Sequence, residues 1–208
     1  MIIAVDGPAA SGKGTIARAL AKHFGLPHLD TGLLYRAVGV AVVRSGGDPD
    51  NAGDALVGCD FPVGLFDDPE LRSEQAGELA SRVSIHPEVR TALVERQRDF
   101  ATQEGGAVLD GRDIGTVIAP DADAKLFVTA STEKRAQRRH QDELKSDPDA
   151  DYNVTLAEIR DRDKRDSERV TAPLRQADDA DLLDTTDLTI SAAVQRAIEL
   201  VEAQKGAR

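Results

Sequence analysis

The feature that most constrains this chain is a glycine-rich segment near its start, made of Gly7, Pro8, Ala9, Ala10, Ser11, Gly12, Lys13, Gly14 and Thr15. An apolar, β-branched run, Ile2–Val5, precedes it, and apolar residues at helical spacing follow it. A strand, a glycine loop and a helix in this order open a βαβ unit. Glycines let backbone N–H groups surround a phosphate, and the helix N-terminus adds its dipole. Lys13 can reach the outer phosphates, so the segment predicts a nucleotide-binding α/β fold.

The rest of the chain alternates strand patterns with helix patterns. Further strands are predicted over Pro27–Asp30, Ala107–Asp110, Ala124–Val128 and Ala180–Asp184. Helices are predicted over Thr15–Phe24, Leu33–Arg44, Pro69–Ser84, Pro87–Gln103, Thr132–Lys145, Leu156–Arg169 and Ser191–Gln204, with Ser131 as an N-cap. This alternation predicts a five-stranded parallel sheet with helices on both faces. Ligands of such sheets bind beyond the carboxyl ends of the strands.

Two segments interrupt this alternation. Residues 48–68 are rich in Asp, Gly and Pro and show only weak periodicity, so we expect an excursion from the main fold. Ser146–Asn153 has the composition of a turn. The whole of 1–208 is expected to form a single domain.

Composition and charge exclude several classes of protein. Of the 208 residues, 26 are Lys or Arg and 37 are Asp or Glu, a net charge of −11 that suits a nucleic-acid-binding surface poorly. A single cysteine, Cys59, excludes an intramolecular disulfide and a multi-cysteine zinc site. The four histidines, His23, His28, His86 and His140, have no metal-binding spacing, and we interpret them as structural. No run of about 18 apolar residues occurs, and the N-terminus has no basic flank. We therefore expect a cytoplasmic protein with no membrane or nucleic-acid partner, and a monomer because no apolar stripe stands out.

Longer motifs resemble a known family. A glycine directly after the loop lysine, here Gly14, resembles the nucleoside monophosphate kinases. Four further motifs closely resemble those of the bacterial cytidylate kinase family. They are Leu29-Asp30-Thr31-Gly32 with Tyr35-Arg36, Leu109-Asp110-Gly111-Arg112-Asp113-Ile114-Gly115-Thr116-Val117, Arg162 with Arg165-Asp166 and Arg169, and Ala172-Pro173-Leu174. The resemblance runs from residue 2 to about residue 200. Thr31 stands where many relatives have Ser, and the 48–68 excursion looks shorter than in longer members.

The resemblance implies a three-layer P-loop kinase fold that transfers phosphate from ATP to CMP or dCMP, a step of pyrimidine nucleotide metabolism. The core would span roughly 1–45, 104–145 and 178–208, the small nucleoside-monophosphate-binding part 46–103 and the lid 146–177. It also implies Mg²⁺ as a cofactor. Because Gly14 replaces the usual Ser or Thr after the lysine, we expect the metal to be held more through water than by a protein ligand.

The resemblance also implies roles for individual residues. The monophosphate would be gripped by Arg36 and Arg112, since guanidinium groups pair bidentately with phosphate oxygens. The base pocket would comprise Asp113, Thr31, Arg90 and Arg169, and the sugar contacts Ser81, Arg162 and Asp166. The catalytic cations would be Lys13, Arg112 and Arg165.

A carboxylate suits cytosine for a physical reason. The N4 amino group of cytosine donates a hydrogen bond to a carboxylate, whereas uracil presents an O4 acceptor there. We therefore expect Asp113 to favour CMP over UMP.

Several interpretations stay open at this level. Asp110 is either an ordinary turn residue or acts on Mg²⁺ through water. Residues 160–169 could form a solvated helix with pairs such as Asp161 with Arg165. One or two of Arg135, Arg138 and Arg139 could reach ATP phosphates.

Two other functions compete with the implied one. The chain could phosphorylate another small acceptor, such as a different monophosphate or shikimate. It could also be a regulatory module that changes shape on binding ATP without transfer, although such a module would not need a second arginine-rich anion site.

Overall fold

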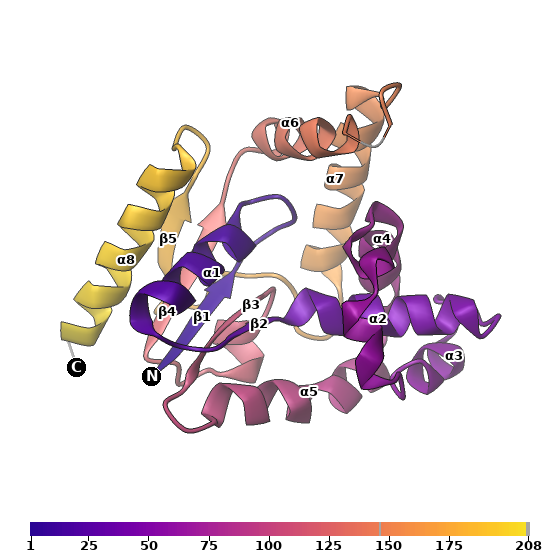
Figure 1. Ribbon diagram of the computed structural model, residues 1–208, viewed down its shortest axis with the longest axis horizontal. Helices are drawn as coiled ribbons and strands as arrows, with labels where there is room; N and C mark the ends of the chain where they lie inside the picture. The colour runs from indigo at the N-terminus through magenta and orange to yellow at the C-terminus, as the bar shows by residue number, and fades with distance from the viewer. Residues whose placement is uncertain (146, 207–208) are drawn as a thin grey trace.

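The computed structural model describes residues 1–145 and 147–206, which surround a five-stranded parallel sheet in the order β2-β3-β1-β4-β5 (Figure 1). The strands are β1 (Ile2–Asp6), β2 (His28–Asp30), β3 (Ala107–Gly111), β4 (Ala124–Thr129) and β5 (Asp181–Asp184). Each neighbouring pair is parallel, which confirms the predicted fold class. Ser146, the first residue of the predicted turn and of the expected lid, and residues 207–208 lie outside the described residues.

Apolar side chains of the strands alternate between the two faces of the sheet, and helices cover both faces. Ile3 and Val5 of β1 face α1 (Lys13–Phe24) and α8 (Ile190–Gly206) in one buried cluster. Ala4 and Leu109 face the other way, toward α5 (Pro87–Thr102) and a single π-helical turn, Ile114–Ile118. The result is the predicted three-layer arrangement, with β1 at its centre.

A third apolar cluster lies to one side of the sheet. It joins α2 (Thr31–Arg44), α3 (Ala52–Val57), α4 (Glu74–Val83) and the first half of α5. The segment 48–68, for which no regular element is predicted, contains α3 and a 3₁₀ helix, Val63–Asp67, and contributes buried Phe61 and Leu65 to this cluster. Tertiary packing therefore orders a segment whose own periodicity is weak.

The predicted helix Pro69–Ser84 is divided in the structure. A 3₁₀ helix, Pro69–Arg72, ends before α4, and Ser73 caps the new helix by accepting a hydrogen bond from the Ala76 N–H at 3.0 Å. Arg36 of α2 donates to the carbonyl oxygens of Leu71 and Ser73 at 2.8 and 2.9 Å. The single-helix prediction is wrong because carbonyls at this break bond to another helix.

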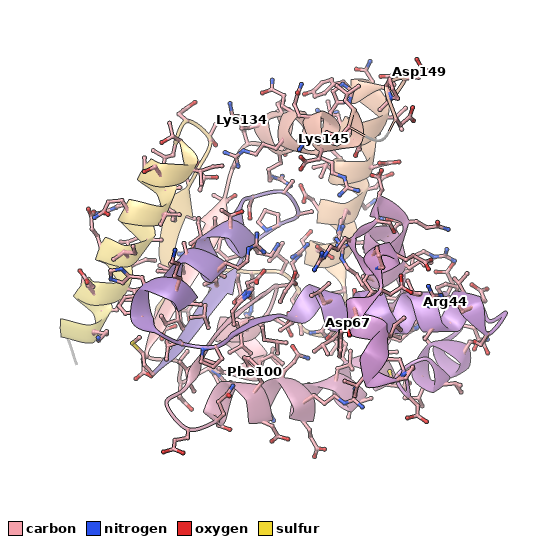
Figure 2. The ribbon with its side chains drawn as sticks, viewed as in Figure 1. Arg44, Asp67, Phe100, Lys134, Lys145 and Asp149 are labelled. Atoms are coloured by element: carbon pink, nitrogen blue, oxygen red, sulfur yellow. The ribbon has the colours of Figure 1, made fainter. Side chains whose placement is uncertain are left out.

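Two charged helices form a corner beyond the sheet (Figure 1). They are α6 (Thr132–Glu143), capped by Ser131 as predicted, and α7 (Tyr152–Glu168). Helix α7 begins four residues earlier than predicted because Asp151 caps it. Figure 2 labels Lys134 on α6 and Asp149 at the loop between the two helices. Among the described residues, no helix is both long and apolar enough to cross a membrane.

Candidate active site

The glycine loop between β1 and α1 has the backbone geometry of a phosphate cradle. Gly12 and Ala10 have positive φ angles of 91° and 57°. A Cβ on Gly7 would lie 2.0 Å from the Val128 carbonyl oxygen, so only glycine fits there. The backbone N–H groups of residues 9–12 have no acceptor among the described residues, which leaves them available to an anion.

Two carbonyl oxygens of this loop accept hydrogen bonds from side chains outside the loop. Arg135 donates to Ala9 O at 3.3 Å, and Arg138 donates to Ser11 O at 3.3 Å. The Thr185 hydroxyl donates to Ser11 O at 2.9 Å. These two arginines therefore bind loop carbonyls. Arg138 and Arg139 also line the cavity, and a contact from one or two of the three arginines of α6 to ATP phosphates stays a prediction.

One cavity of about 1,030 Å³ opens from this loop. It is lined by residues 9–15 of the loop and by every other residue named above as a catalytic or substrate contact: Thr31, Arg36, Ser81, Arg90, Arg112, Asp113, Arg162, Arg165, Asp166 and Arg169. Gly7 and Pro8 belong to the loop but not to the lining. The chain thus brings residues from position 9 to position 169 into one space.

Cations crowd the middle of the cavity. Burial and the nearby charges of Arg112, Arg36 and Arg139 lower the pKa of Arg162 to about 10. The Nε of Arg112 donates to Asp166 Oδ2 at 2.7 Å. The Nε of Arg162 is buried with no hydrogen-bond partner among the described residues. Such a cluster favours a bound polyanion.

Lys13 shares this environment. Burial and, after it, the charge of Arg112 lower the pKa of its ammonium to about 7, although the charges of Asp110 and Asp30 act in the opposite direction. Its ammonium donates to Pro8 O at 3.3 Å, within the loop itself. A phosphate in the loop would restore the charged form of this lysine.

A smaller polar group lies at the end of the cavity next to α5. Asp113 forms a buried ion pair with Arg90, and its Oδ1 lies 3.8 Å from Arg169 Nη2. Arg90 also lies over the Tyr35 ring, 5.5 Å from its centre. The Ser81 hydroxyl and Arg169 Nη2 are buried with no hydrogen-bond partner among the described residues. Unpaired buried polar atoms are costly, so a polar ligand would stabilise this pocket.

Two arginines of the cavity join the helices that flank it. Arg165 of α7 binds Glu78 of α4 through two hydrogen bonds of 2.5 and 2.7 Å. The solvated-helix interpretation expects a pair with Asp161, but among the described residues the ion-pair partner of Arg165 is Glu78. Arg139 of α6 binds Glu74 of α4 at 2.7 Å and Glu143 at 2.8 Å.

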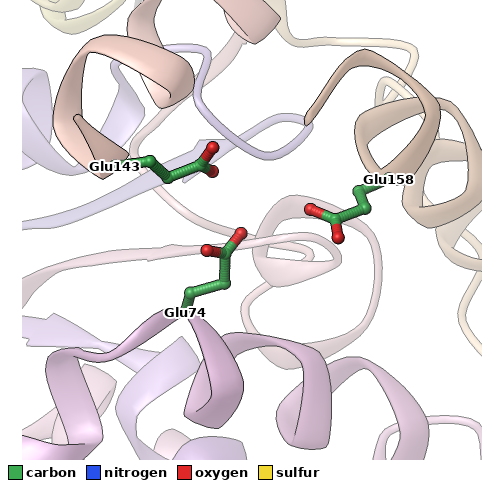
Figure 3. Close-up of side chains that lie close together, drawn as sticks. All are labelled: Glu74, Glu143 and Glu158. Atoms are coloured by element: carbon green, nitrogen blue, oxygen red, sulfur yellow. The ribbon is translucent and has the colours of Figure 1, made fainter. Parts of the chain in front are cut away.

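Glu74, Glu143 and Glu158 approach one another at this point (Figure 3). Their nearest carboxylate oxygens all lie within 4.8 Å of each other. Arg139 supplies the positive charge between Glu74 and Glu143. Burial, helped by both neighbouring carboxylates, raises the pKa of Glu158.

Several residues that line the cavity have no role predicted from the sequence. Glu74 and Glu78 of α4, Tyr35, and Thr185 after β5 all line the cavity. The two glutamates carry no signal in the sequence, because their arginine partners lie more than 60 residues further along the chain. Tyr35 stands beside Arg36 in the quoted motif and could have been included on that basis.

The chain matches the family model of the cytidylate kinases over residues 3–59 and 66–203. It is 55% identical over 208 residues to a cytidylate kinase of Xanthobacter autotrophicus, with all of both chains covered. It is 58% identical over 200 residues to one of Cereibacter sphaeroides, covering 96% of this chain and 94% of that one.

A solved structure supports the fold alone. An uncharacterized protein from Eubacterium ventriosum matches with a TM-score of 0.58 at 16% identity, over 98% of this chain and 99% of that one. The sequence matches go further, because they span nearly the full length at more than half identity. This chain belongs to the cytidylate kinase family.

Proposed function

We propose that this protein transfers the terminal phosphoryl group of ATP to CMP and dCMP, giving ADP with CDP or dCDP. The observation that carries the proposal is the cluster of Arg36, Arg112 and Arg162 beside Lys13 in one cavity. One nucleotide would occupy the loop. The arginine cluster exceeds the need of a single triphosphate and supports a second anionic substrate facing it.

The reaction needs no protein nucleophile. An oxygen of the CMP phosphate, already anionic near neutral pH, attacks the γ-phosphorus of ATP, and the bond from that phosphorus to the β,γ-bridging oxygen breaks. Lys13, Arg112 and Arg165 would offset the charge that spreads over the transferred group. Arg165 must exchange its bonds to Glu78 for bonds to the phosphates, and a partly exposed ion pair costs little to break.

The acceptor would lie between the cluster and the Asp113 pocket. Arg36 and Arg112 would bind its phosphate, while Ser81, Arg162 and Asp166 would contact the sugar. The unpaired hydroxyl of Ser81 supports this assignment.

The base would lie beside Asp113, which its buried ion pair with Arg90 holds in place. Its carboxylate would accept the N4 amino hydrogen of cytosine, next to Thr31 and Arg169. Uracil has an O4 acceptor at this position, and two acceptors cannot form a hydrogen bond with each other, so UMP should bind poorly.

Mg²⁺ fits the carboxyl ends of β2 and β3. Asp30 and Asp110 are register neighbours there, and burial together with the Asp110 charge raises the pKa of Asp30. Two nearby carboxylates favour a cation, and Mg²⁺ prefers oxygen ligands and retains several waters. Bound Mg²⁺ would neutralise phosphate charge, while Asp30 and Asp110 would hold its waters.

The division of the chain follows from this assignment. Residues 146–177 would form a lid that excludes water from the transfer, and 46–103 the acceptor-binding part. The ion pairs from α4 to α6 and α7 support a lid that contacts the acceptor-binding part. A monomeric state and a cytoplasmic location stay predictions from the sequence.

The test is to incubate the protein with ATP, Mg²⁺ and one acceptor at a time, and to separate the nucleotides by chromatography. CDP and dCDP should form from CMP and dCMP, with little product from UMP and none from shikimate. ADP without CDP would refute the assignment, and efficient phosphorylation of another acceptor would replace it. ATP binding with no transfer to any acceptor would favour the regulatory module.

A further inference from the structure

His28 of β2 and Asp110 of β3 form a partly buried pair on neighbouring strands of the sheet. The His28 imidazole Nε2 lies 2.7 Å from Asp110 Oδ1, and their side chains are 18% and 4% exposed. His28 is opposite Val108 in the sheet register, so Asp110 is its diagonal neighbour on the next strand. A carboxylate has two acceptor oxygens, and this hydrogen bond uses one of them.

The hydrogen bond to His28 fixes the orientation of the Asp110 carboxylate. Among residues 1–145 and 147–206, no donor other than His28 is recorded for the Asp110 side chain. Oδ1 is therefore occupied and Oδ2 is open. A Cβ placed on Gly14 would lie 3.6 Å from Oδ2, which locates that oxygen at the first turn of α1.

The carboxylate of Asp110 lies near other charged groups of the phosphate-binding site. Lys13 and Asp30 both interact with its charge at the mouth of the phosphate loop. The Thr31 hydroxyl donates to the Asp110 backbone carbonyl at 2.8 Å, which fixes the main chain but not the carboxylate. Among the described residues, the imidazole is the side chain that hydrogen-bonds the carboxylate itself.

We propose that His28 is a positioning residue, which turns Asp110 so that its free oxygen holds the waters of the Mg²⁺ bound with ATP. The inference rests on the proposed function and deepens it. Groups that orient metal-binding carboxylates typically change metal affinity by about 10–100-fold when they are removed. His28, interpreted from the sequence as structural, thereby gains a role in the donor site.

The experiment measures ATP binding by calorimetry without CMP, once with saturating Mg²⁺ and once with a chelator. The ratio of the two dissociation constants reports the coupling between metal and nucleotide. His28→Leu should reduce this ratio about tenfold, and His28→Gln, which retains an N–H donor, should recover much of it. His23→Leu is the matched control, since His23 is 43% exposed on α1 and outside the cavity.

Asp110→Asn should lose the same coupling, and the double variant with His28→Leu should lose no more. An unchanged ratio in His28→Leu would overturn the proposal. Equal weakening of ATP binding with and without metal would also overturn it, because it would mean a purely structural role. Failure of the wild type to make CDP would refute the proposed function alone, since this ratio is measured without turnover.

Discussion

Lys13 is a cation placed among cations, and its buried ammonium has a pKa of about 7 in the free protein. Above that pH the ligand-free lysine is mostly neutral. Bound phosphates favour its charged form, so the pKa must rise on binding and a proton must be taken up. The affinity for ATP should accordingly fall as the pH rises above 7.

Calorimetry of ATP binding at pH 8 in buffers of different ionisation enthalpy should show uptake of nearly one proton. Lys13→Met should abolish this uptake, while Lys145→Met, at a side chain that is 75% exposed, should leave it unchanged. Equal uptake in Lys13→Met would assign the proton to another group.

Lys13→Met should also reduce kcat by roughly 10²–10³-fold or more, because a cation aimed at the transition state is lost. The thermal midpoint should not fall, because burial disfavours the lysine charge in the folded protein. Rates of CDP formation and thermal unfolding measure the two effects. A fully active Lys13→Met protein would contradict the role given to this residue.

Asp113 is expected to set the choice of base. Asp113→Ala should lower the CMP-to-UMP ratio of kcat/KM by about 10–100-fold, the value of one good polar contact to a base edge. Arg90 loses its buried partner in this variant, so Asp113→Asn, which preserves the shape, is the companion. Unchanged discrimination in both variants would mean that another group contacts N4.

At the level of elements, helices α2 and α4 meet at Gly39, where a Cβ would lie 2.6 Å from Leu79 Cβ. Gly39→Ala should therefore destabilise the protein by about 1–3 kcal/mol by forcing the two helices apart. Gly64→Ala is the matched control, since no atom lies within 4 Å of its added Cβ. Urea unfolding of both variants tests this, and equal stability would show that the helices can separate freely.

The elements that the sequence predicted well are those whose signal is local. Short apolar runs marked the strands within one residue, and Ser131 marked the start of α6. The break at Ser73 was missed because Arg36, 37 residues earlier, binds its carbonyl. The partner of Arg165 was missed because Glu78 belongs to a helix far away in sequence. A local sequence pattern therefore does not predict which polar groups pair when they lie far apart in the chain.

For the molecule as a whole, the cavity spans two apolar cores. Arg36 and Ser81 come from helices of the cluster beside the sheet, whereas Arg112 follows β3. A nucleotide bound between them should stabilise both cores together, by about 2.7 kcal/mol at a hundred times its Kd.

CMP at that concentration should raise the thermal midpoint by about 5–10 °C. UMP at the same concentration should have a smaller effect, and melting curves with each nucleotide make the comparison. A shift that is equal for CMP and UMP would argue against selection at the binding step.

The hydrogen bonds from Arg135, Arg138 and Thr185 to the back of the phosphate loop have a kinetic consequence. A loop whose carbonyl oxygens are already engaged needs no rearrangement before it receives a triphosphate, so capture should take place in a single step whose rate rises linearly with ATP concentration. Variants of the cavity cations should then differ mainly in how long the nucleotide stays, not in how fast it arrives.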